Sequence, residues 1–320
     1  MASSEQPVVV IAGPTASGKS RFALAVAREF AGTIINADSM QVYRDLRVLT
    51  ARPSDDELAC APHRLYGTVD AAESCSAGRW RDLALIEIAR ARCERRLPIL
   101  VGGTGLYLSA LLEGIADIPA VPATVVAEAR ALHARLGGEE FRRALAALDP
   151  TSAGKLPAAD TQRLVRAFAV VCATGIPLSV WQQRQAPHRG PAASAVILLP
   201  PRDALYAAID QRLERMFAAG AIDEVRSLLA RQLSPLLPAM KAVGVRDIGL
   251  FLAGECTRDA ALAAAQQATR RYAKRQYTWF RNRLPASKKL RKTIMDTQFS
   301  EKSLPGIFSF IRQFLLTESK

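Results

Sequence analysis

The sequence predicts an α/β protein, with a parallel sheet covered by helices on both faces and an all-helical domain inserted into this core. Short apolar runs that alternate with stretches of helical periodicity predict the sheet. Residues 116–195 are rich in Ala and Arg and contain no convincing strand, which predicts the insertion. The predicted core therefore comprises residues 1–115 and 196–320, and the predicted helical domain comprises residues 116–195.

Four apolar runs are typical of strands that are buried on both faces, and they lie at residues 8–12, 33–38, 98–103 and 195–199. A glycine-rich turn and a helix follow the first run, and another helix follows the third. A long helical stretch at 202–230 follows the fourth run. Parallel strands need such crossover connections, so the alternation indicates a parallel sheet.

The periodicity of the inserted segment predicts three helices, at 123–137, 138–149 and 160–175. Gly-Gly, Asp-Pro and Gly-Ile-Pro breaks separate them. Proline-rich stretches at 117–122 and 185–191 are typical of points where a domain leaves and re-enters a core. Residues after Pro285 show a mixed pattern, and we expect them to be peripheral.

The composition is that of a globular protein, since 49% of the 320 residues are apolar and 23% are charged. No apolar run approaches the ~18 residues that a membrane-spanning helix needs, and the N-terminus lacks the features of a signal peptide. We therefore expect a cytoplasmic protein without membrane association. Five cysteines without a CxxC pair and three scattered histidines argue against a disulfide scaffold and a zinc site.

The chain is strongly basic, with 43 Lys and Arg against 30 Asp and Glu and a formal charge of +13. A scattered excess of Arg would serve only solubility. The stretch 270–292, however, carries ten basic residues and no acidic one, interleaved with Tyr272, Tyr277, Trp279 and Phe280. Basic residues mixed with aromatic rings are typical of nucleic-acid-binding surfaces, so this stretch predicts an RNA or DNA partner.

The segment GPTASGKS matches the phosphate-binding pattern G-x-x-x-x-G-K-[ST], between a predicted strand and a predicted helix. The candidate phosphate-binding residues are Gly13, Pro14, Thr15, Ala16, Ser17, Gly18, Lys19 and Ser20. Main-chain N–H groups and the helix N-terminus would surround phosphate oxygens, Lys19 would add a positive charge, and the Ser20 hydroxyl could bind Mg²⁺. The sequence thus predicts a core of the P-loop NTPase type that binds a diphosphate or triphosphate.

Asp38 closes the second apolar run and should lie near the mouth of the phosphate-binding loop. Its carboxylate could cap a helix or stabilise a turn, bind a water molecule of Mg²⁺ or act as a general base, and the spacing alone favours the cap or the metal. Thr104 precedes a helix, where a capping hydroxyl is the simplest interpretation. His63, Trp80 and Trp181 are expected to have structural roles.

Five segments, in this order, resemble bacterial tRNA dimethylallyltransferases. They are GPTASGKS, NADSMQVYRDL, PHRLYGTVD, LVGGTGLYLSALLEG and YAKRQYTWFRNR. Together they extend over about residues 8–285 and are far more specific than the phosphate-binding pattern alone. The resemblance implies transfer of the dimethylallyl group from dimethylallyl diphosphate to N6 of the adenosine 3′ to the anticodon of tRNA, with release of diphosphate.

The resemblance also implies catalytic residues. Asp38 matches the family's general base, and an exocyclic amine needs one because its lone pair is delocalised into the ring. Lys19 and Arg212 would neutralise the diphosphate, whereas without the resemblance Arg212 is equally a solvated helical residue. Thr104 matches a position that touches tRNA, and Mg²⁺ would be the cofactor, with Ser20 as a ligand.

The helical domain at 116–195 would hold the anticodon stem-loop of tRNA, and the protein would act as a monomer. Because the target base is stacked inside the loop, it must be extruded to reach a buried site. The implied tRNA contacts are Asp38, Ser39, Met40, Gln41, Thr104, Val126, Gln162, Arg163, Leu164, Val165, Arg166, Lys241, Ala242, Val243, Gly244, Val245, Arg246, Lys274, Arg275, Gln276, Tyr277, Thr278, Trp279, Phe280 and Arg281.

Two other functions compete with the prenyl transfer. A P-loop kinase for a small molecule or nucleotide would use the same Lys19 and Ser20 on ATP, but it leaves the basic aromatic stretch without a purpose. A non-catalytic or ATP-gated RNA-binding protein explains the charge, but it does not explain Asp38 beside a complete phosphate-binding pattern.

Overall fold

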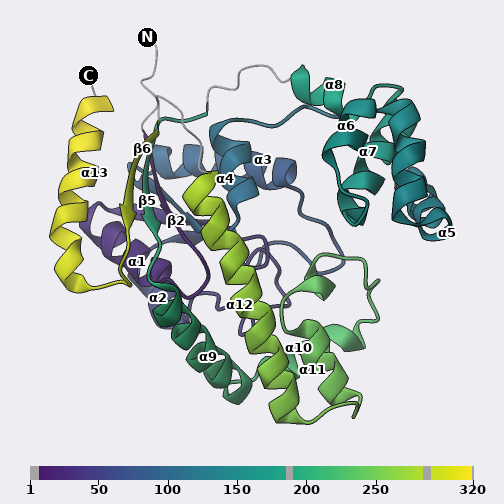
Figure 1. Cartoon of the computed structure of the whole chain (residues 1–320). Coiled ribbons are helices and arrows are strands. Elements are labelled where there is room, and N and C mark those ends of the chain that lie inside the picture. The colour runs from purple at the N-terminus through teal and green to yellow at the C-terminus, as the bar shows by residue number, and fades with distance from the viewer. Residues whose placement is uncertain (1–6, 185–189, 284–289, 319–320) are drawn as a thin grey trace. The chain divides into compact units, whose positions relative to one another are not determined.

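A six-stranded sheet forms the centre of the core in the computed structural model, which describes residues 7–184, 190–283 and 290–318 (Figure 1). The strands are β1 (Val8–Ala12), β2 (Gly32–Asn36), β3 (His63–Arg64), β4 (Leu97–Gly102), β5 (Ala193–Leu198) and β6 (Leu290–Met295). Their spatial order is β3-β2-β4-β1-β5-β6, and every neighbouring pair is parallel. The predicted α/β class is confirmed.

Helices cover both faces of this sheet. They are α1 (Lys19–Glu29), α2 (Asp55–Cys60), α3 (Ala77–Cys93), α4 (Gly105–Leu112), α9 (Arg202–Ala218), α10 (Ala221–Ala230), α11 (Val245–Leu252), α12 (Arg258–Asn282) and α13 (Leu304–Glu318), with short 3-10 turns at Ala239–Lys241 and Glu301–Ser303. Val8 and Val10 of β1 pack in one cluster with α3, α4 and α12, and Val9 and Ile11 pack in another with α1 and α13. Burial on both faces explains why the strands read as continuous apolar runs.

The position of β1 in the sheet places the phosphate-binding loop. β1 lies between β4 and β5, and the chain passes from β1 to β2 on one side and reaches β5 on the other only later. Ligands of open parallel sheets bind at such a reversal of strand order, outside the carboxyl ends of the strands. The loop that follows Ala12 opens at this point of the sheet.

The inserted segment is a compact unit of its own, comprising residues 114–189. Its helices are α5 (Ala123–Leu148), α6 (Pro150–Lys155), α7 (Thr161–Thr174) and α8 (Leu178–Gln183). Gly137 has a φ of 77° and interrupts α5, where the Gly-Gly break was predicted. Between residues 114 and 184 the described chain contains helices and no strand.

The C-terminal boundary of the insertion differs from the predicted one at residue 195. β5 begins at Ala193, which pairs with Val8, and the core unit resumes at residue 190. The reason is that β5 pairs along the full length of β1, so it must begin opposite the first residue of that strand. Residues 185–189, which belong to the predicted proline-rich stretch at 185–191, lie outside the described residues.

The prediction that the C-terminal residues are peripheral is wrong. β6 pairs with β5 from Leu290 to Met295, and α13 packs against α1 (Figure 1). Ile307, Ile311 and Phe314 of α13 are buried. The sequence pattern is weak here because β6 is an edge strand whose charged side chains are exposed, so it lacks the continuous apolar run of β1 or β5.

Within the described ranges, none of the helices has the length and apolar character needed to cross a membrane.

The packing of α13 predicts that this helix contributes to the stability of the whole core. Replacing Ile311, which is 0% exposed, with Ala should lower the free energy of unfolding by about 2–5 kcal/mol, because a buried aliphatic side chain leaves a cavity. Leu316→Ala on the same helix, where the side chain is 70% exposed, should change it by less than about 0.5 kcal/mol. Urea unfolding of both variants measures the difference, and equal stabilities would contradict the integral role of α13.

Candidate active site

The phosphate-binding loop forms between β1 and α1, as the sequence predicts. Gly18 precedes α1 with a φ of 88°, and a side chain there would approach Phe299 Cβ to 2.8 Å, so only glycine fits. Lys19 Nζ donates a hydrogen bond to the Pro14 carbonyl at 3.1 Å. The buried Ser17 hydroxyl has no hydrogen-bond partner among the described residues. The loop therefore retains donor capacity that an anion can use.

Two cations lie at this loop, Lys19 from α1 and Arg212 from α9. Burial lowers the pKa of Lys19 to about 8, although Asp38 opposes this shift and Arg212 adds to it. Burial also lowers the pKa of Arg212 to about 10, against the influence of Asp38. Both shifts show that the positive charges have lost water without full compensation, so the site favours an anion.

Arg212 does not extend into solvent, which rules out the interpretation as a solvated helical residue. Its guanidinium donates a hydrogen bond to the Thr15 hydroxyl, and its buried Nε has no partner in the described part of the chain. The side chain thus joins α9 to the phosphate-binding loop and keeps one N–H available. An arginine in this place can neutralise charge on a phosphate held by the loop.

Asp38 lies two residues after β2, in a turn that fixes its carboxylate. The Asn36 side chain accepts a hydrogen bond from the Asp38 N–H at 2.9 Å and donates one to the Asp38 carbonyl at 3.0 Å. Asp38 Oδ1 accepts the N–H of Met40 at 2.9 Å. This is a local turn contact and not a helix cap, because no helix begins at this point of the chain.

Thr104 holds this turn from the other side. Its hydroxyl accepts the N–H of Ser39 at 2.9 Å and donates to Ser39 Oγ at 3.2 Å, and it makes no capping bond to α4. The capping role expected for Thr104 is therefore wrong. The hydroxyl of Tyr272 on α12 is also bonded to Thr104, while burial and Asp38 raise its pKa. Sequence reasoning noted Tyr272 only as one aromatic residue of the basic stretch.

Two cavities of the core meet at these side chains. A larger cavity of about 550 Å³ lies at the phosphate-binding loop and includes Lys19 and Ser20 in its wall. A smaller cavity of about 230 Å³ has a mainly apolar wall that includes Leu49, Leu213 and Val243. The residues common to both walls are Thr15, Asp38, Thr50 and Arg212. A ligand that extends from one cavity to the other would pass the carboxylate of Asp38 and the guanidinium of Arg212.

Gln276, expected from the resemblance to contact tRNA, is 5% exposed and faces the sheet. Its side-chain oxygen accepts the Thr15 N–H at 2.8 Å, and its side-chain nitrogen donates to the Gly103 carbonyl at 2.8 Å. A side chain at Gly103 would approach the Gln276 nitrogen to 2.2 Å, so glycine permits this approach of α12. Gln276 of α12 therefore positions the phosphate-binding loop through its contact with the Thr15 N–H.

Other residues expected at the RNA divide by burial. In the described structure those with exposed side chains are Gln162, Arg163, Arg166, Lys241, Arg246, Lys274, Arg275, Thr278 and Arg281. Those with buried side chains are Leu164, Val165, Ala242, Val245 and Phe280. Those that are half-buried are Val126, Val243, Tyr277 and Trp279. The buried residues pack in the hydrophobic clusters of their own unit. They thereby support the segments on which the exposed residues lie.

Few side chains of the described residues are placed to act as ligands for Mg²⁺. Across the described ranges, no three side chains of His, Cys, Asp or Glu are grouped as a metal site. The Ser20 hydroxyl is exposed at the start of α1 and lies in the wall of the larger cavity. Mg²⁺ commonly takes one or two protein oxygens and completes its shell with water and phosphate, so this donor set fits an ion that arrives with a phosphate ligand.

The contacts of Gln276 predict that this residue controls anion binding without touching the anion. Gln276→Ala leaves the Thr15 N–H and the Gly103 carbonyl without their partner and should weaken binding of inorganic pyrophosphate about tenfold. Lys274→Ala, on the exposed face of α12, should leave this affinity unchanged. Calorimetric titration of both variants with pyrophosphate and Mg²⁺ distinguishes them, and equal affinities would contradict the role of Gln276.

Comparisons with known proteins show the family to which this chain belongs. The family model described as IPP transferase matches residues 41–283, and the one described as isopentenyl transferase matches residues 6–75. A tRNA dimethylallyltransferase of Rhodospirillum centenum is 55% identical over 286 residues, which cover 89% of this chain and 91% of that protein. One of Paramagnetospirillum magneticum is 50% identical over 320 residues, which cover 99% of both proteins.

Solved structures give the same result. The full-length tRNA isopentenylpyrophosphate transferase of Bacillus halodurans is 30% identical with a TM-score of 0.67, and the match covers 98% of each chain. A eukaryotic dimethylallyltransferase acting on tRNA is 25% identical with a TM-score of 0.81, and the match covers 96% of this chain and 79% of the other. Because sequence and fold agree over nearly the whole length, the chain belongs to the IPP transferase family, together with the tRNA dimethylallyltransferases that it matches.

Proposed function

We propose that this protein transfers the dimethylallyl group of dimethylallyl diphosphate to N6 of the adenosine 3′ to the anticodon in tRNA. The observation that carries the proposal is the position of Asp38, in the wall shared by an anion-binding cavity and a smaller, mainly apolar one. Membership of the IPP transferase family supports the same reaction. A kinase would need the smaller cavity for a phosphate acceptor. The apolar wall of this cavity suits a prenyl chain and a base better than it suits a polar phosphate acceptor.

The donor would lie across the two cavities. Its diphosphate would take the N–H groups of the phosphate-binding loop, with Lys19 and Arg212 on either side. Both cations are desolvated, so their attraction for a polyanion is stronger than it would be in water. The dimethylallyl group would then point toward the apolar wall, and the C–O bond to be broken would lie near Asp38.

The chemistry follows from this placement. The N6 lone pair attacks the allylic carbon, the C–O bond breaks, and its electron pair leaves with the diphosphate. Arg212 and Lys19 stabilise the charge that develops on the leaving oxygen. Asp38 accepts the N6 proton as the N–C bond forms and later returns it to solvent. The Asn36 and Met40 contacts keep the carboxylate in place for this transfer.

Mg²⁺ is proposed as the cofactor, bound by the diphosphate together with the Ser20 hydroxyl. When bound, it would supply charge neutralisation to the leaving diphosphate. The protein contributes the exposed hydroxyl at the N-terminus of α1, where the partial charge of the helix also favours an anion.

The tRNA would be held by exposed cations in both units. Lys274, Arg275 and Arg281 lie on the exposed side of α12, and Arg163 and Arg166 lie on α7 of the helical unit. These cations suit the phosphates of an anticodon stem-loop, from which the target base must be extruded to reach the smaller cavity. We also propose that the protein acts as a monomer in the cytoplasm, where tRNA is present.

Two labelled substrates test the function directly. Purified protein with Mg²⁺ and tRNA that lacks the modification should move label from dimethylallyl diphosphate to tRNA. It should not move phosphate from γ-labelled ATP. Asp38→Asn keeps an acceptor for the Met40 N–H but removes the base, and should lower the transfer rate about 100-fold or more with little change in tRNA affinity. Phosphate transfer without prenyl transfer would establish the kinase alternative instead.

The lowered pKa of Lys19 predicts a pH dependence of donor binding. Lys19 attracts the diphosphate only when it is protonated, and its pKa in the free protein is about 8. Raising the pH from about 7 to about 9 should therefore weaken pyrophosphate binding roughly tenfold. Lys19→Arg stays charged over this range and shows only the titration of pyrophosphate itself. Parallel pH profiles for the two proteins would contradict the prediction.

A further inference from the structure

The segment 46–53, between β2 and α2, contributes to both cavities although it contains no helix or strand. Leu49 and Thr50 lie in the wall of the smaller cavity, and Thr50 and Arg52 lie in the wall of the larger one. The hydrogen bonds within the segment are confined to turns, such as that from the Ala51 N–H to the Val48 carbonyl at 3.0 Å, so its position depends on contacts with other parts of the chain. The contacts that hold it therefore determine the shape of the substrate site.

Glu224, in the first turn of α10, makes the most concentrated of these contacts. Its carboxylate accepts the N–H groups of three consecutive residues, Arg47, Val48 and Leu49, and the Val48 and Leu49 bonds are both 2.8 Å long. Successive N–H groups that converge in this way form a binding site for an anion, and here the anion is a side chain. Hydrogen bonds to a carboxylate are about twice as strong as neutral ones.

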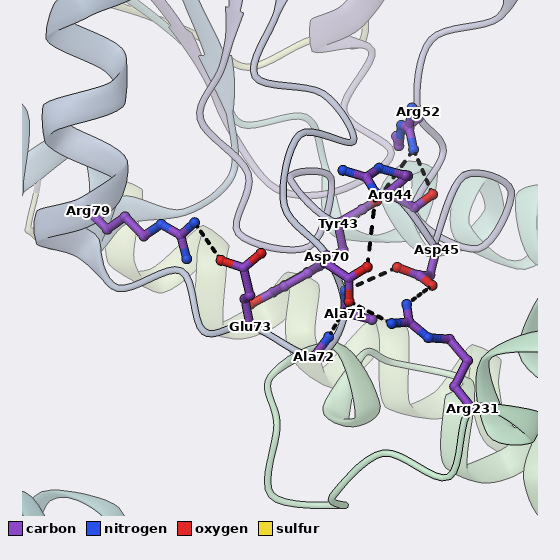
Figure 2. A network of polar contacts seen from close by, with 10 residues as sticks. All are labelled: Tyr43, Arg44, Asp45, Arg52, Asp70, Ala71, Ala72, Glu73, Arg79 and Arg231. Carbon is purple, nitrogen blue, oxygen red and sulfur yellow. Dashed lines mark hydrogen bonds and ion pairs between the residues drawn. The ribbon is translucent and has the colours of Figure 1, made fainter. Parts of the chain in front are cut away.

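Further contacts hold the two ends of the segment. Arg231, which follows α10, donates to Asp45 and to Asp70, the latter at 2.7 Å (Figure 2). At the other end, the Arg52 guanidinium donates to the Arg44 carbonyl at 3.1 Å, as Figure 2 also shows. The Gln41 side chain donates to the carbonyls of residues 50 and 51 at 2.8 and 2.9 Å. Among the described residues, Glu224 is the acceptor for the N–H groups at 47–49.

The side chain of Leu49 follows its main chain because it has little space to move independently. Leu49 is buried in the main hydrophobic cluster. It also lies against Gly244, where an added side chain would approach Leu49 Cδ1 to 3.0 Å. A displacement of the Leu49 amide would therefore displace the apolar wall of the smaller cavity.

We infer that Glu224 is a positioning residue for the donor. By holding the N–H groups at 47–49, Glu224 sets the position of Leu49 and hence the length of the prenyl chain that the smaller cavity accepts. Glu224 itself lies in the wall of neither cavity. The inference rests on the proposed function, because it assigns the apolar wall to the prenyl group. It adds a determinant of donor specificity from a helix outside the phosphate-binding loop.

The test compares two neighbouring acidic residues of α10. Glu224→Gln keeps the size of the side chain but removes its charge and one acceptor. Asp223→Asn makes the same change at an exposed residue that pairs only with Arg226 among the contacts of the described chain. The amides at 47–49 should exchange hydrogen about tenfold faster in Glu224→Gln, as measured by mass spectrometry, and at the wild-type rate in Asp223→Asn.

Donor preference is the second readout. In Glu224→Gln, the ratio of kcat/KM for dimethylallyl diphosphate over geranyl diphosphate should fall about fivefold or more, since a displaced wall discriminates less by chain length. Leu49→Ala should lower the same ratio while leaving amide exchange at 47 and 48 unchanged. Asp223→Asn should keep the wild-type ratio.

A Glu224→Gln protein with a lower melting temperature but wild-type exchange and wild-type donor ratio would overturn the inference. Faster exchange with an unchanged donor ratio would also overturn it, since the contact would then be structural only. Failure of the proposed function is distinguishable, because it would appear in the wild-type protein as absence of prenyl transfer to tRNA.

Discussion

The two hydrogen bonds of the Gln276 carboxamide join the parts from which the candidate active site is built. One reaches the phosphate-binding loop at Thr15, the other reaches the turn after β4 at Gly103, and the side chain itself comes from α12. Because the contact is buried, losing either partner would leave a polar group without water or protein to bind. The helix that carries the exposed Lys274 and Arg275 is thereby fixed to the loop that would bind the diphosphate.

The electrostatics of the site follow from this close packing. Bringing α9 and α12 against the loop removes water from Lys19 and Arg212, and the pKa of each falls as a result. Asp38 offsets the shifts in part, since it is the carboxylate acting on both groups. The two desolvated cations suit a ligand that carries several negative charges. The carboxylate suits a proton donor that lies next to it. A diphosphate with an amine acceptor meets both conditions.

The walls of the cavities depend on contacts that lie outside them. Thr104 fixes Ser39 beside Asp38, Glu224 holds the amides that lead to Leu49, and Gln276 supports the phosphate-binding loop. Each is a polar side chain that satisfies main-chain groups of an irregular segment. Loops can present reactive groups with accuracy only when such contacts hold them, because they lack the hydrogen bonding of helices and strands.

Local patterns in the sequence determined β1, β2, β4 and β5, the phosphate-binding loop and the helical insertion, because apolar periodicity and glycine spacing act between near neighbours. The two-residue β3 has no such pattern and was not predicted. Asp38 was placed near the loop because both follow parallel strands. The tertiary structure alone decided that β6 completes the sheet, that Thr104 bonds Ser39 and makes no cap, and that Gln276 faces inward. It also decided that Glu224 meets a segment some 175 residues earlier in the chain. These contacts join residues that lie far apart in the sequence. A local sequence pattern therefore does not show which distant main-chain group will hydrogen-bond to a given polar side chain.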